Sequence, residues 1–239
     1  NHADKENLGM GEEVKEFELL LKDYFGREAV SVINGTSAIQ LAIQACNISN
    51  GDEILVPSLT YIATFQAIRA TGAVPVACDV DTDLCFLDPK DAEKRITNKT
   101  KAVMYVGMGG NSGDMREIQW ICKEHGLKLI LDAAHMAGTY TKDVFDGCAM
   151  AICHTGWEAD VTVFSFQAVK NLPTADSGMI CFKEEKYDKL VRQLSWLGID
   201  KDTYSRTNAK GNYTWEYDVP YLGFKFHGNS IMASIALAA

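Results

Sequence analysis

The chain has 239 residues, 47% of them hydrophobic, with a formal net charge of −9 and an isoelectric point near 5.0. This length and hydrophobic content allow a large buried core, so the composition excludes an intrinsically disordered protein and favours one large domain spanning residues 1–239. The acidic balance argues against nucleic acid or an anionic membrane as the main partner.

The cysteine pattern and the lengths of the apolar runs indicate the cellular compartment of the protein. Seven cysteines occur without a C-x-x-C pair, which predicts reduced core thiols and no metal site. No apolar run reaches the length of a membrane span, and the polar N-terminus lacks a signal-peptide core. We therefore expect a soluble, cytoplasmic protein that binds neither nucleic acid nor a membrane.

Short apolar runs, typical of buried strands, alternate along the chain with amphipathic segments, typical of helices. In chain order the predicted elements are helix Glu12 to Tyr24, strand Ala29 to Ile33, helix Ala38 to Cys46, strand Glu53 to Val56, a helix from Tyr61 through Ala70, strand Ala73 to Asp79, helix Pro89 to Arg95, strand Ala102 to Val106, helix Asp114 to His125, strand Lys128 to Leu131, strands Val161 to Phe166 and Ser177 to Phe182, helix Glu184 to Leu197 and a helix beginning near Asn229. The region Thr139 to Asp160 receives no regular structure. The alternation predicts an α/β domain whose mostly parallel central sheet is flanked by helices on both faces.

A short polar turn, Asn34-Gly35-Thr36-Ser37, joins the first predicted strand to the helix that follows it. This layout would place free backbone N–H groups and the hydroxyls of Thr36 and Ser37 at a helix N-terminus, where phosphate binds readily. The same residues can equally serve as an ordinary N-cap. The sequence alone leaves both interpretations open.

Further polar and aromatic residues follow other predicted strands. In a mostly parallel sheet the carboxyl ends of the strands form the edge at which ligands bind. Tyr61, Asp132, His135 and Lys170 all fall at such ends, together with the turn at Gly35 to Ser37. A lysine amine held there can attack a carbonyl group. The plainer alternatives are a solvated lysine, a helix-capping aspartate, and a histidine and an aromatic ring of the core.

Several segments of the chain carry a family resemblance when they are taken together. In chain order they are NGTSAIQLAI, GDEILVPSLTYIAT followed by GAVPVACDVD, GLKLILDAAHMAGTY, DVTVFSFQAVKNLPTADSGMICF and, more loosely, LGFKFHGNSIMASIALA. They resemble the DegT/DnrJ/EryC1/StrS family of pyridoxal-phosphate (PLP) sugar aminotransferases over nearly the whole chain. The resemblance implies the architecture of a fold-type-I PLP-dependent transferase. Members of that family also carry a small C-terminal domain, which we expect to be absent from these 239 residues.

The resemblance implies a role for each polar residue at the predicted strand ends. Lys170 matches the lysine that forms the Schiff base with PLP and shuttles the proton, and Asp132 matches the carboxylate that pairs with the pyridine nitrogen. His135 matches a residue near the 3-oxygen of the cofactor. Tyr61 matches the aromatic residue that stacks on the pyridine ring.

The resemblance also implies a phosphate cup formed by Gly35, Thr36, Ser37 and Ser165. One position departs from the family pattern, because His227 stands where the family commonly has an asparagine that reaches the phosphate of the partner subunit's cofactor. An imidazole can still donate a hydrogen bond to phosphate, so we retain His227 as a cofactor-binding candidate.

The implied activity is transamination from an amino-acid donor, expected to be L-glutamate, to a nucleotide-linked keto sugar, carried out by a homodimer with shared active sites. A PLP-dependent sugar dehydratase is one alternative, although that branch has a histidine at the position of Lys170. A cysteine desulfurase would need an exposed nucleophilic cysteine, for which Cys148 and Cys153 are the nearest candidates. A catalytically inactive PLP-binding regulatory protein is the alternative from a different functional class.

Overall fold

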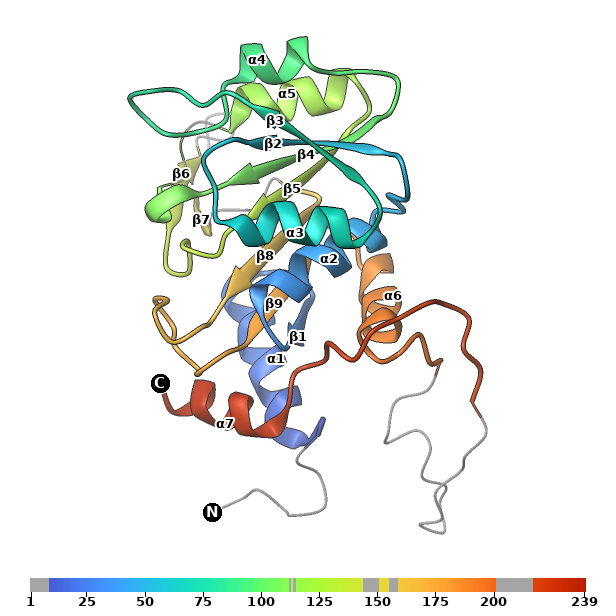
Figure 1. The fold of residues 1–239 in the computed structure, drawn as a ribbon. Coiled ribbons are helices and arrows are strands. Elements are labelled where there is room, and N and C mark those ends of the chain that lie inside the picture. The colour runs from blue at the N-terminus through green and yellow to red at the C-terminus, as the bar shows by residue number, and fades with distance from the viewer. Residues whose placement is uncertain (1–8, 112, 114, 144–150, 155–158, 201–216) are drawn as a thin grey trace.

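The computed structural model of the protein describes residues 9–111, 113, 115–143, 151–154, 159–200 and 217–239 (Figure 1). A seven-stranded sheet with the order β1-β9-β8-β5-β4-β2-β3 runs through the centre. Strands β3, β2, β4, β5 and β8 are parallel, and β9 lies antiparallel between β8 and β1, which confirms the mostly parallel sheet. The strands of this sheet are β1 Ala29–Val32, β2 Glu53–Pro57, β3 Val74–Cys78, β4 Thr100–Val106, β5 Lys128–Asp132, β8 Val161–Ser165 and β9 Gly178–Phe182.

Helices lie at the positions predicted from the amphipathic segments, with ends shifted by a few residues. The largest shift is at the start of α2, which begins at Gly35 because Asn34 caps it. Among the described residues, no helix combines the length and apolarity that a bilayer crossing requires. Asp114, the predicted cap of α5, lies outside the described residues. The helices are α1 Glu12–Phe25, α2 Gly35–Ala45, α3 Ile62–Ala70, α4 Pro89–Lys94, α5 Arg116–Glu124, α6 Lys186–Ser195 and α7 Ser230–Ala238, with a 3-10 turn, η1, at Met108–Gly110.

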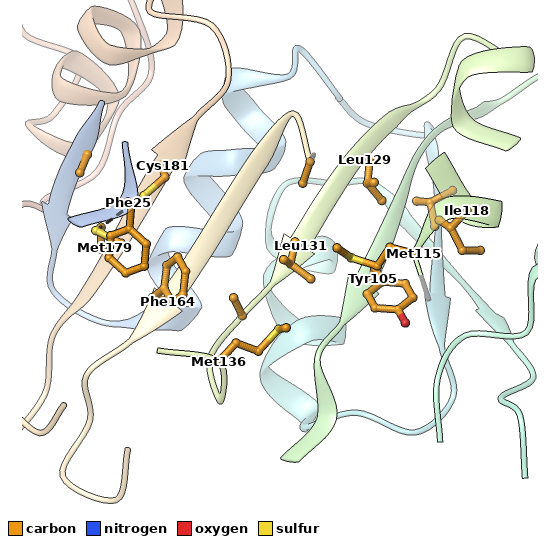
Figure 2. Close-up of a cluster of buried hydrophobic side chains, with 14 of the residues drawn as sticks. Phe25, Tyr105, Met115, Ile118, Leu129, Leu131, Met136, Phe164, Met179 and Cys181 are labelled. Carbon is orange, nitrogen blue, oxygen red and sulfur yellow. Dashed lines mark hydrogen bonds between the residues drawn. The ribbon is translucent and has the colours of Figure 1, made fainter. Parts of the chain in front are cut away.

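The two faces of the sheet bury two separate hydrophobic clusters, because successive side chains of a strand point to opposite faces. Tyr105, Leu131 and Phe164 point into the layer beneath α1, α4, α5 and α7 (Figure 2). Their neighbours Ile130 and Val163 point to the other face, which α2, α3 and α6 cover. The chain is therefore a three-layer α/β/α structure. Helices on both faces leave the strand ends as the place where polar side chains can gather.

The prediction that Thr139 to Asp160 has no regular structure is wrong. This segment contains a two-stranded antiparallel sheet of β6, Tyr140–Asp143, and β7, Ala151–His154. Each strand is only four residues long and mixes polar with apolar residues, so neither shows a recognisable alternation. Pairing between the two strands supplies the backbone hydrogen bonds that define them.

Candidate active site

A cavity of about 720 Å³ opens at the carboxyl ends of β4, β5 and β8. The first turns of α2 and α3 and the loop after β8 complete its wall. This is the edge of the sheet at which ligands bind in α/β proteins. Most of the site residues predicted from the sequence line this one cavity, namely Gly35, Thr36, Tyr61, Asp132, His135, Ser165 and Lys170, whereas Ser37 and His227 do not.

The start of α2 is held by a capping box. The Asn34 side chain accepts a hydrogen bond from the Ser37 backbone N–H at 2.8 Å, and the Ser37 hydroxyl accepts from the Asn34 backbone N–H at 3.3 Å. The same hydroxyl donates to the Asn34 carbonyl oxygen at 2.8 Å. Ser37 is buried by this arrangement, so the capping interpretation holds for its hydroxyl. A Cβ atom on Gly35 would lie 3.0 Å from the Ser165 Cβ atom, so glycine lets the end of β8 approach the helix start closely. Gly35, Thr36 and Ser165 therefore meet at one end of the cavity.

Asp132 is the last residue of β5, and only 6% of it is exposed. One carboxylate oxygen accepts a hydrogen bond from the Ala134 backbone N–H at 3.2 Å, and the other accepts from the Thr64 hydroxyl at 3.1 Å. Burial raises the pKa of this carboxyl above its usual range, while the two hydrogen bonds oppose the shift. Among the described residues, no ion pair involves Asp132. The chain after it forms a turn, so the helix-capping alternative is wrong.

His135 lies on the turn that follows Asp132, where the loop after β4 holds its ring. The Gly109 backbone N–H donates to His135 Nδ1 at 3.3 Å. Burial, and then the nearby positive charge of Lys170, lower the pKa of this imidazole, which favours the neutral ring. A neutral ring that accepts at Nδ1 carries its proton on Nε2. Because His135 lines the cavity, this ring is a hydrogen-bond donor for the site.

Lys170 lies in the loop between β8 and β9, which continues the pairing of the two strands. Backbone hydrogen bonds join Phe166 to Ser177 and Ala168 to Ala175, and Lys170 N–H donates to the Gln167 carbonyl at 2.8 Å. The loop is therefore an ordered support that carries the half-buried Lys170 side chain into the cavity wall.

The start of α3 contributes residues that the sequence analysis missed. Thr60 and Thr64 line the cavity together with Tyr61, a residue that is 74% exposed. Their hydroxyl oxygens are 2.9 Å apart. The spacing of four residues, which places two side chains on one face of a helix start, is a signal that could have identified this pair. Asp176, after β8, is a further cavity residue that the sequence analysis passed over.

His227 lies away from the cavity of its own chain. It forms an isolated bridge with Val32, and its ring contacts the Trp196 ring with centroids 4.3 Å apart. Its Nδ1 atom lies 2.6 Å from the Gly228 carbonyl oxygen, which can only accept. Burial lowers the pKa of this imidazole. In the neutral ring Nδ1 therefore donates, and Nε2 is left as an acceptor.

Four of the five cysteine side chains that can be described have unreactive thiols. Burial raises the pKa of the thiols of Cys46, Cys122 and Cys181 to about 12 and that of Cys78 to about 11. Such thiols are protonated at neutral pH and are poor nucleophiles. The candidates for a desulfurase nucleophile, Cys148 and the side chain of Cys153, fall outside the described part of the structure.

Fold and cavity together define a class: an α/β/α protein with a lysine, a buried carboxylate and a helix N-terminus at the ends of parallel strands. Among solved structures, the chain is similar to the aminotransferase TlmJ from Streptoalloteichus hindustanus, with a TM-score of 0.82 and 31% identity over 98% of this chain and 59% of that one. It is also similar to the putative sugar aminotransferase Spr1654 from Streptococcus pneumoniae in its PLP form, with a TM-score of 0.83 and 28% identity over 97% and 59% of the two chains.

The sequence comparisons show the family. The model of the DegT/DnrJ/EryC1/StrS aminotransferase family matches residues 1–239, so the chain belongs to this family, as the sequence predicted. The spore coat polysaccharide biosynthesis protein SpsC of Bacillus subtilis (strain 168) is 35% identical over 231 residues. That match covers 96% of this chain and 57% of SpsC. The chain thus spans little more than half the length of this relative.

Proposed function

We propose that the chain is the PLP-binding large domain of a transaminase that transfers an amino group, with L-glutamate as the expected donor, to a nucleotide-linked keto sugar. The observation that carries the proposal is the convergence of Lys170, Asp132, His135 and the start of α2 on one cavity. Membership of an aminotransferase family and the description of Spr1654 as a putative sugar aminotransferase support it. The name of SpsC further supports a product used in polysaccharide biosynthesis.

The cavity fits PLP in charge. Asp132 is a buried carboxylate whose hydrogen-bond donors are a hydroxyl and an amide, so a protonated ring nitrogen would supply the positive charge that burial calls for. The start of α2 offers the positive end of a helix dipole to a phosphate, and Gly35 lets Ser165 lie close to that helix start. Thr36 and Ser165 lie beside it as further donors. The residues present therefore suit both ends of the cofactor.

When bound, PLP supplies an electron sink for the carbon from which a proton is removed. Asp132 would hold a proton on the ring nitrogen, which would maintain that sink. His135 would donate from Nε2 to an oxygen of the ligand, and Tyr61 would pack against its ring. Lys170 would hold the cofactor through its amine and, as a general base placed in the cavity wall, would take up and return the substrate proton.

Replacing Lys170 tests the proposal in the complete protein. With Lys170→Ala we expect glutamate-dependent amination of a panel of nucleotide keto sugars to fall below detection, together with release of 2-oxoglutarate. Lys183→Ala, an exposed lysine just after β9, is the matched control and should retain activity. Product mass distinguishes transamination from dehydration, which adds no nitrogen. Normal turnover by Lys170→Ala would overturn the assignment, and PLP binding without turnover by the unaltered protein would favour the regulatory alternative.

We further propose a homodimer in which His227 serves the site of the neighbouring subunit, because His227 lies away from the cavity of its own chain. To donate to a phosphate there, the ring has to be protonated, since Nε2 of the neutral ring can only accept. Light scattering should report twice the mass of one chain. Mixing Lys170→Ala and His227→Ala subunits then gives one site per mixed dimer with both residues intact. Random assortment would restore about a quarter of the normal activity. If mixing restores nothing, His227 does not act across the interface. The cytoplasmic location stays a prediction.

A further inference from the structure

We infer that Thr64, supported by Thr60, is the positioning residue that orients the Asp132 carboxylate toward the cavity and keeps it an acceptor. The inference rests on the proposed function and extends it to a residue that the family resemblance did not single out. Its basis is a chain of hydrogen bonds from Thr60 through Thr64 to Asp132, at the start of α3 and the end of β5.

The placement of Thr64 is unusual for a threonine in a helix. Helical threonine hydroxyls commonly bond to a carbonyl one turn back or face solvent. Thr64 has no exposed surface, and its hydroxyl donates at 3.1 Å to Asp132, a residue 68 positions away in the sequence. That bond fixes one carboxylate oxygen, while the Ala134 N–H fixes the other. The plane of the carboxylate is therefore set by two donors from different elements.

The ionised state of Asp132 determines which threonine hydroxyl donates each hydrogen bond. A carboxylate that binds a protonated ring nitrogen must be ionised, and an ionised carboxylate can only accept. The Thr64 hydroxyl therefore donates to Asp132, so its single proton is committed there. The hydrogen bond of 2.9 Å between the two hydroxyls must then be donated by Thr60. Thr60 acts on Asp132 through Thr64, because it polarises the hydroxyl that touches the carboxylate.

Each carboxylate oxygen retains acceptor capacity beyond these single bonds. Because Asp132 lines the cavity, a ligand N–H can donate to this remaining acceptor capacity from the cavity. Without the Thr64 hydroxyl, Asp132 can rotate or take up a proton, and either change weakens its bond to a ring nitrogen. The expected consequence is weaker cofactor binding together with slower turnover.

The test uses the complete protein and PLP itself, with three substitutions of near-equal size. Thr64→Val removes the hydroxyl and should weaken PLP binding, measured by equilibrium dialysis, by about 10- to 100-fold. Thr64→Ser keeps the hydroxyl and should bind PLP within about threefold of the unaltered protein, within the scatter of single hydrogen-bond effects. Thr60→Val should give a smaller loss. The kcat for glutamate should fall with PLP affinity while its KM changes little, because Thr64 is fully buried and its hydroxyl proton is committed to Asp132.

A matched control and a double variant separate positioning from simple destabilisation. Thr100→Val replaces a buried threonine at the first residue of β4, the end of that strand away from the cavity, and should lower thermal stability without changing PLP affinity. The double variant Thr60→Val/Thr64→Val should bind PLP no more weakly than Thr64→Val alone, because Thr60 acts through Thr64. Normal PLP affinity in Thr64→Val, or additive losses in the double variant, would overturn the inference. Failure of the unaltered protein to bind PLP would instead overturn the proposed function.

Discussion

The protein buries two carboxylates in opposite ways. Glu18 of α1 accepts a hydrogen bond from the Ser31 N–H at 2.8 Å and lies 2.7 Å from an Arg192 guanidinium nitrogen of α6. Asp132 is equally buried, but its bonds come from Thr64 and Ala134, which carry no charge. Burial raises the pKa of both carboxyls, and only Glu18 has a permanent cation hydrogen-bonded to it. A buried charge compensated within the chain stabilises the fold, whereas one compensated by neutral donors beside a cavity is available to a ligand.

When each carboxylate is replaced by its amide, the largest loss of activity is expected at Asp132. Asp132→Asn should lower kcat by about 100- to 1,000-fold, the usual cost of removing one electrostatic contact at a reacting site. The stability of the ligand-free protein should stay equal or rise, because a buried charge with neutral donors is removed. Steady-state kinetics measure the expected fall in kcat, and thermal unfolding without PLP measures the expected stability. A large loss of stability would show that Asp132 is structural.

The matching change, Glu18→Gln, should have the opposite pattern. An amide nitrogen facing Arg192 leaves the guanidinium partly buried beside another donor, although Asp188 still accepts from the Arg192 Nε atom at 3.0 Å. We expect a loss of about 3 kcal/mol in the free energy of unfolding. Urea unfolding measures this, and kcat should be unchanged in the fraction that remains folded. A kcat that falls as far as in Asp132→Asn would erase the distinction between the two carboxylates.

A smaller effect, on stability alone, is expected in the loop that carries Lys170. Ala175 has a φ of 72°, a left-handed conformation that costs a residue with a Cβ atom about 1 kcal/mol. Ala175→Gly should therefore raise the free energy of unfolding by up to about 1 kcal/mol. Ala168→Gly, in the same loop but without a positive φ, should instead lower it. Equal effects of the two glycines would show that the loop stores no such strain.

Much of the fold could be predicted because its signals are local. The apolar run at Val161 to Phe166 and the stop at Gly26 depend on neighbours in the sequence, and the structure places a strand and a helix end there. The four-residue strands β6 and β7 could not be predicted, since they exist only through pairing with each other. The candidate residues at strand ends were recognised for the same local reason. Which of them share a cavity was not a local property.

The helices, most strands, the family and the polar residues that follow buried strands (Asp132, His135 and Lys170) can be inferred from the amino-acid sequence. The folded structure is needed to show that β9 runs antiparallel, that Ser37 closes a capping box, and that Thr64 rather than a cation holds Asp132. The difference lies in how far along the sequence each interaction reaches. Periodicity and capping act over a few residues, whereas the partner of a buried charge depends on which strands and helices become neighbours in the folded sheet.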